Sequence, residues 1–302
     1  MLIGHQKQWQ YLQWLVRKDI LPHALLFSGE NQLGKKTIAF ELAKLLLCEQ
    51  RNKDGLCQNC RTCRDIMLGR HPDCILVEAK DKKEISIAQI RELERFLALH
   101  PLTGRYKIGI IDEAHMMGHE AQHAFLKTLE EPRGKTIVIL ISSKPFLLLS
   151  TIRSRTQQIK FFPVPNEELE KGLRESNQDE EKLVNIINLS WGRPGRAITL
   201  VNSNELFRKT ISEVKYIISL TTASLQERFA LAEKVAQNKV SSISNILEEW
   251  THIFRSLWLK KNCPSHFITF LKNIQKTNFL ILRTNTNPRL VFEILLMDLP
   301  QL

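Results

Sequence analysis

Short apolar runs alternate with longer segments of helical spacing through the first half of the chain. Short, mostly apolar runs predict strands at about 24–27, 74–77, 108–112 and 136–141, and a further short strand is expected at about 157–161. Apolar positions three or four residues apart predict helices over 6–17, 35–47, 87–99 and 122–129. Because strands alternate with helices, the pattern favours an α/β fold with a parallel sheet covered on both faces.

This alternation ends at the segment 161–165, where Pro163 and Pro165 remove backbone donors and exclude a helix. Everything beyond it has helical patterning. We therefore expect an α/β module over residues 1–163, a small helical unit over 164–203 and an all-α domain of four or five helices over 204–302.

Charge and hydropathy narrow the function classes only slightly. The 302 residues carry a formal charge of +11, which suits an acidic partner such as DNA. Residues 1–204 contribute +6 and residues 205–302 contribute +5, so no single basic arm accounts for the excess. No apolar stretch approaches the roughly 18 residues of a membrane span, and the amphipathic start has no signal-peptide core. We expect a cytoplasmic protein with no membrane partner.

A glycine-rich loop joins the first predicted strand to the next helix. Gly29, Gly34 and Lys35 have the spacing of a phosphate loop, in which backbone N–H groups and a lysine face phosphate oxygens. The hydroxyl that normally ligates Mg²⁺ is replaced by Lys36, and Thr37 lies one residue further on, rotated by about 100° on the helix. The pattern predicts a degenerate nucleotide site, while a plain turn at Gly34 is the alternative.

Two carboxylates end the predicted strand at 108–112. Asp112 has the position of a residue that holds Mg²⁺ through water, and Glu113 that of a residue that orients an attacking water. This is the pattern of a Walker B motif. Acidic residues in the first turn of a helix are the structural alternative, because they stabilise its dipole.

Four of the six cysteines lie within sixteen residues. Cys48, Cys57, Cys60 and Cys63 supply enough thiolates to close a tetrahedral Zn²⁺ shell with no open position for water. The segment 48–63 is therefore predicted to be a structural zinc-binding insertion, with four metal-free buried thiols as the alternative.

An arginine ends the connection between the last two predicted strands. Arg155 closes the segment Ser150-Thr-Ile-Arg-Ser-Arg, where a guanidinium could reach a phosphate on a neighbouring molecule. A surface ion pair is the alternative.

Taken together, these motifs resemble the clamp-loader branch of the AAA+ ATPases, and within it the delta prime family of bacterial DNA polymerase III. The resemblance rests on the order of several segments along almost the whole chain: His23–Gly29, the cysteine insertion, Asp112–His115, Ala124–Pro132, Ser154–Arg155 and Asn285–Glu293. It implies an AAA+ P-loop module, a helical lid and a helical collar that assembles subunits into a pentameric ring.

The same resemblance implies a function for the whole complex. Its members load a sliding clamp onto primed DNA, with ATP and Mg²⁺ bound by neighbouring motor subunits named gamma or tau and a further delta subunit. Lys36 in the loop, and Gly195 where motor subunits have a sensing arginine, favour a stator that does not itself hydrolyse ATP. The resemblance assigns Arg155 a role in trans, as an arginine finger on the adjacent motor subunit.

Two alternatives remain open at this point. Asp112 and Glu113 favour an ATP-hydrolysing subunit of the gamma or tau kind, which Lys36 opposes. A zinc-containing DNA-binding module without a clamp-loading role belongs to a different class. No carboxylate constellation of a polymerase is visible, so any DNA polymerase activity would belong to the holoenzyme.

Overall fold

The computed structural model describes residues 2–50, 57, 59–79, 84–132, 134–174, 179–238, 240–261 and 266–300. Within the predicted insertion at 48–63, residues 51–56 and 58 therefore lie outside the described residues. The chain divides into two compact units, Met1–Asn202 and Ser203–Leu302. None of the described helices is long and apolar enough to cross a membrane.

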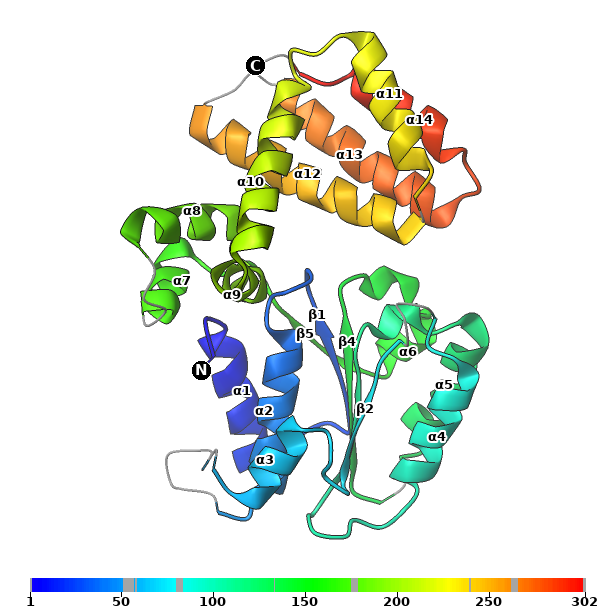
Figure 1. Cartoon of the computed structure of the whole chain (residues 1–302). Helices are drawn as coiled ribbons and strands as arrows, with labels where there is room; N and C mark the ends of the chain where they lie inside the picture. The colour runs from blue at the N-terminus through cyan, green and yellow to red at the C-terminus, as the bar shows by residue number, and fades with distance from the viewer. Residues whose placement is uncertain are drawn as a thin grey trace. The chain divides into compact units, whose positions relative to one another are not determined.

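A five-stranded parallel sheet forms the centre of the first unit, as the alternating pattern predicts (Figure 1). The strand order is β2-β3-β4-β1-β5, and every described pairing is parallel. The strands are β1 (Ala24–Ser28), β2 (Cys74–Val77), β3 (Lys107–Ile111), β4 (Thr136–Ser142) and β5 (Gln157–Lys160). All the strand ends that carry the glycine loop and the acidic pair therefore meet at one edge of the sheet.

Helices cover both faces of this sheet (Figure 1). One face is packed by α1 (Gln6–Arg17), α2 (Lys35–Leu47) and α3 (Arg61–Met67), the other by α4 (Ile87–Leu97), α5 (His119–Glu130) and α6 (Ser150–Ser154). Side chains of β1 alternate between the two cores: Leu25 and Phe27 join the first, Ala24 and Leu26 the second. Burial on both faces explains why β1 is apolar throughout.

The helices agree with the predicted ranges except at their ends. The helix expected over 87–99 stops at Leu97, and the one expected over 122–129 starts earlier, at His119 after the N-cap Gly118. Sequence patterning missed α3 and α6, because seven and five residues are too few to show a helical period.

Three further helices complete the first unit after the proline segment. They are α7 (Asn166–Leu173), α8 (Glu180–Ser190) and α9 (Pro194–Asn202). Between α8 and α9, Trp191 and Gly192 both have positive φ, and Gly192 O accepts a hydrogen bond from Val164 N at 2.7 Å. A Cβ at Gly192 would lie 2.7 Å from Pro163 Cβ, so this turn requires glycine.

The second unit is all-α, as expected. Its described helices are α10 (Asn204–Ser219), α11 (Leu225–Ala236), α12 (Val240–Lys261), α13 (His266–Arg283) and α14 (Pro288–Met297). Its core includes Phe254 and Phe270, whose rings meet edge to face at 4.8 Å. The buried guanidinium of Arg228 donates to the carbonyls of Leu220, Thr221 and Leu296, which joins the C-terminal ends of α10 and α14.

Candidate functional site

The glycine loop has the backbone of a phosphate loop. It follows β1 and ends at Gly34, the N-cap of α2, whose φ of 90° belongs to the left-handed region. Gly29 also has a positive φ, and a Cβ there would lie 2.4 Å from the Phe161 carbonyl oxygen. Glycine is required at both positions for steric reasons. The strand, loop and helix therefore stand in the order that a phosphate site needs.

Lys35 is buried and directed back onto the loop itself. Its Nζ donates to the carbonyl oxygens of Gly29 at 2.7 Å and Glu30 at 2.5 Å. A phosphate-binding lysine must present its ammonium to the ligand, so in this conformation these loop carbonyls compete with any phosphate for it.

Lys36 forms ion pairs with two carboxylates. Its Nζ lies 2.8 Å from Glu78 Oε2 and 3.0 Å from Asp112 Oδ2. Partial burial by itself lowers the pKa of Lys36, but hydrogen bonds to Glu78 and Asp112 outweigh it and raise that pKa. A permanent ammonium therefore lies where Asp112 would otherwise face a divalent cation. Thr37 is exposed, and the described contacts contain no hydrogen bond between it and Asp112.

Glu113 is engaged by neighbours from the same sheet edge. It has left-handed backbone, with φ of 48°, and its Oε2 accepts a hydrogen bond from Ser143 Oγ at 3.2 Å. His115 Nε2 lies 3.3 Å from the same oxygen, and its Nδ1 is 3.2 Å from Ser142 Oγ. Burial raises the pKa of Glu113 and lowers the pKa of His115 to about 4. Sequence reasoning did not identify Ser142 and Ser143, although both directly follow the strand predicted over 136–141.

The helices after the proline segment close over the loop. Gly195 N, in the first turn of α9, donates to Gln32 O at 2.8 Å, and His5 Nε2 hydrogen-bonds to Leu33 O at 2.8 Å. The cavity that remains is about 60 Å³ and is lined by Gly34, Thr37 and Gly195, among others. Ligand pockets usually measure about 300–1,000 Å³, so this cavity is smaller than an ordinary nucleotide pocket.

Arg155 lies at the surface, directly after α6. Its guanidinium makes two contacts: Nη2 lies 2.6 Å from Glu130 Oε1, and Nη1 donates to the Thr151 carbonyl oxygen at 3.1 Å. The side chain is 37% exposed, so it is accessible to a neighbouring molecule.

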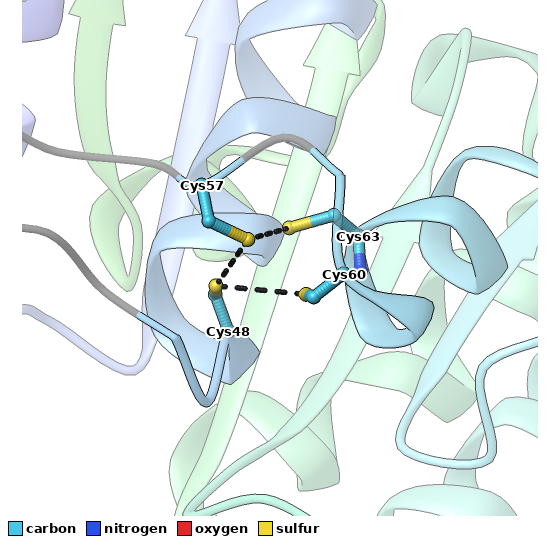
Figure 2. A group of neighbouring side chains, drawn as sticks. All are labelled: Cys48, Cys57, Cys60 and Cys63. Carbon is cyan, nitrogen blue, oxygen red and sulfur yellow. Dashed lines mark hydrogen bonds between the residues drawn. The ribbon is translucent and has the colours of Figure 1, made fainter.

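The four predicted cysteines converge at the C-terminal end of α2 and the start of α3 (Figure 2). Their Sγ atoms all lie within 4.8 Å of one another, and Cys48 and Cys57 are separated by 3.4 Å. The pairs Cys48–Cys60 and Cys57–Cys63 are separated by 3.8 Å each. Tetrahedral Zn–S bonds of about 2.3 Å place sulfurs about 3.8 Å apart, so this set fits a metal ion.

Comparison with known proteins places the chain among subunits of DNA polymerase III. The family model described as "DNA polymerase III, delta subunit" matches residues 4–165. The delta′ subunit of DNA polymerase III from Pseudomonas aeruginosa is 34% identical over 62% of this chain and 58% of its own length. The delta′ subunit from Bacillus subtilis is 30% identical over 80% of this chain and 68% of its own length.

Relatives with other names also match. The gamma subunit of DNA polymerase III from Buchnera aphidicola is 30% identical over 88% of this chain and 76% of its own length. A solved structure of a gamma subunit-related protein from Thermotoga maritima is 17% identical, with a TM-score of 0.49 over 95% of this chain and 97% of that chain. The match to the delta family model covers more than half of the chain, and relatives named delta′ recur in several bacteria. The chain belongs to the delta′ family of DNA polymerase III clamp-loader subunits.

Proposed function

We propose that this protein is the stator of a DNA polymerase III clamp loader, a subunit that supports ATP hydrolysis by its neighbours without hydrolysing ATP itself. The observation that carries this proposal is the ion pair of Lys36 with Asp112. An ammonium at that position opposes binding of Mg²⁺ by electrostatic repulsion, and catalysis of phosphoryl transfer depends on that ion. The small cavity beside Gly34, about 60 Å³, supports the same conclusion.

Arg155 is the residue through which we propose that the stator acts. Its side chain is 37% exposed, and its guanidinium is oriented by two contacts and is the group expected to reach the ATP of an adjacent motor subunit. An arginine finger supplied in trans stabilises charge on the transferring phosphoryl group and is worth about 10³–10⁵ in rate. An accessible Arg155, together with the Lys36–Asp112 ion pair, fits a subunit that supports hydrolysis by a neighbour and does not hydrolyse ATP itself.

The proposed partners are gamma or tau and delta subunits in a hetero-pentameric ring, the sliding clamp and primed DNA, in the cytoplasm. The proposed parts are an AAA+ module (1–163), a lid (164–203) and a collar (204–302). The collar role is supported by an apolar stripe on α14, where Leu290, Ile294 and Met297 are all more than half exposed. Such a stripe on a helix is typical of a surface buried by association.

We propose Zn²⁺ as the metal of the four-cysteine cluster. Four thiolates in tetrahedral reach favour Zn²⁺ over oxygen-preferring Mg²⁺ and Ca²⁺, and a closed S₄ set has no open position for a reactive water. The metal would therefore fix the end of α2 to the start of α3 without taking part in catalysis.

The test is reconstitution of the loader from this chain with its motor and delta subunits. Clamp- and DNA-stimulated ATP hydrolysis is measured for the wild type and Arg155→Ala, with assembly followed by size-exclusion chromatography. We expect a large loss of rate with assembly intact. An unchanged rate would contradict a trans-acting role of Arg155.

The second candidate is an ATP-hydrolysing subunit of the gamma or tau kind, favoured by the presence of Asp112 and Glu113 at the end of β3. Steady hydrolysis by the isolated chain that is lost in Lys35→Ala would support it over the stator.

A further inference from the structure

Arg155 and Glu130 come from two elements that pack together. Glu130 is the last residue of α5, and Arg155 is the C-cap of α6, which lies against α5. The distance of 2.6 Å between Glu130 Oε1 and Arg155 Nη2 is that of a short, charge-assisted hydrogen bond. The two residues are 25 positions apart in sequence and the segment between them contains β4, so this contact depends on the tertiary fold.

The two contacts of Arg155 restrain its guanidinium at both terminal nitrogens. Nη1 is held by the Thr151 carbonyl and Nη2 by Glu130. A guanidinium carries five N–H donors in a planar fork, so these two hydrogen bonds set its orientation and leave further donors for an anion. Side chains of both residues are more than one-third exposed, and an ion pair at such a site adds little to folding stability.

We propose that Glu130 is a positioning residue for Arg155: it holds the guanidinium in the orientation in which the remaining donors meet the phosphate of the neighbouring subunit's ATP. This inference rests on the proposed trans role of Arg155. Without this partner, the long arginine side chain samples several rotamers. The entropic cost of fixing one rotamer then adds to the activation free energy of the reaction. Glu130 acts only through Arg155 and does not touch the nucleotide.

The experiment uses the reconstituted loader with Glu130→Ala, Glu130→Gln and the matched control Glu131→Ala, which alters the adjacent exposed carboxylate. Stimulated hydrolysis is measured against ATP concentration to separate kcat from KM. We expect Glu130→Ala to lower kcat about tenfold with little change in KM, because a finger acts mainly in the transition state. Glu130→Gln keeps a hydrogen-bond acceptor and should retain part of the rate. Glu131→Ala should match the wild type.

A double-mutant cycle separates positioning from a general structural effect. In the Arg155→Ala background, Glu130→Ala should cause no further loss, because its effect passes through Arg155. A full additional loss would overturn the proposal, and so would an unchanged or raised kcat in Glu130→Ala while Arg155→Ala is impaired. If Arg155→Ala itself leaves the rate unchanged, the trans role fails, and the role of Glu130 fails with it.

Discussion

The ammonium of Lys36 lies 3.0 Å from the carboxylate of Asp112, so the glycine loop and the acidic strand end of this protein are joined by a side chain. Glu78 completes the arrangement at 2.8 Å from the same Nζ. Two carboxylates around one cation resemble the surroundings of a divalent metal, but here the cation is covalently part of the chain. Under the proposed stator role, this ion pair accounts for a strand, glycine loop and helix of phosphate-loop form that lack an Mg²⁺ site of their own.

Replacing Lys36 should partly restore a cation site. In Lys36→Thr the ammonium is removed, and a hydroxyl takes the position normally used for Mg²⁺. We expect Mn²⁺ to bind at least about tenfold more tightly than to the wild type, a gain of about 1.4 kcal/mol. Electron paramagnetic resonance of free Mn²⁺ measures this. The gain should disappear in Lys36→Thr/Asp112→Asn, and a wild type that binds as tightly as Lys36→Thr would contradict the interpretation.

The buried pair Asp73–Lys107 should contribute strongly to stability. Asp73 is fully buried, lies 3.0 Å from Lys107 Nζ and accepts hydrogen bonds from the N–H groups of Leu102, Thr103 and Gly104. Asp73→Ala leaves the lysine buried without its partner, so we expect a loss of about 3–5 kcal/mol in the free energy of unfolding. Asp65→Ala, which breaks the exposed pair with Arg61, should cost less than about 0.5 kcal/mol. Urea titration compares the two.

The same aspartate should also contribute to acid sensitivity. Burial raises the pKa of Asp73, but hydrogen bonds from Leu102, Thr103 and Lys107 outweigh burial, and its net pKa is well below the usual range. Its folded pKa is below its unfolded pKa, so its stabilisation is present above about pH 4 and is lost as the pH falls further. The stability difference between wild type and Asp73→Asn should therefore shrink below about pH 4. A constant difference across that range would contradict this assignment.

His115 should give the protein a second dependence on pH at mildly acidic values. Burial lowers the pKa of His115 from 6.5 to about 4, so the unfolded state binds its proton first as the pH falls. The contribution of His115 to the free energy of unfolding should be fully present above about pH 6.5. It should decline toward pH 4 by an amount on the order of 2–3 kcal/mol. His115→Gln should flatten this decline, whereas the exposed His100→Gln should not. Melting temperatures at a series of pH values measure both.

Removal of metal from the cysteine cluster should have a local effect. Cys57→Ser/Cys60→Ser removes two of the four ligands, so we expect loss of one bound zinc per chain by elemental analysis. Because the two cores of the sheet do not include these four cysteines, we expect far-ultraviolet circular dichroism to keep most of its intensity. Unfolding of the whole chain on chelation would show that the metal stabilises more than the junction of α2 and α3.

The apolar stripe on α14 should be needed for assembly and not for folding. Ile294 is 64% exposed, so Ile294→Asp should leave the melting temperature of the isolated chain nearly unchanged. In a ring, the same substitution would bury a carboxylate without a partner, and we expect at least a tenfold weaker association, about 1.4 kcal/mol. Exposed Glu205→Ala on α10 is a control. Normal assembly of Ile294→Asp would exclude this stripe from the interface.

Local patterning determined a large part of what the structure shows. Apolar runs at β1, β3 and β4 identified central strands, because burial on both faces demands continuous apolar sequence. The four cysteines were identifiable as a group because their spacing confines them to one compact segment. Lys36 was recognisable as a departure from a phosphate loop, since the meaning of that position depends on its neighbours in sequence.

Other features depended on the tertiary structure. The strand order β2-β3-β4-β1-β5 joins segments that are distant in sequence, and no local pattern encodes those hydrogen bonds. For the same reason, the sequence shows a lysine at position 36 in place of the usual hydroxyl residue, but it does not show that this lysine pairs with Glu78, 42 residues away. The contact of Arg155 with Glu130, before the amino ends of β5 and β4, and that of Glu113 with Ser143, after the carboxyl ends of β3 and β4, likewise depend on which segments the parallel sheet brings together. The sequence gives the chemical type of each side chain directly, whereas long-range packing decides which partner each charged group contacts.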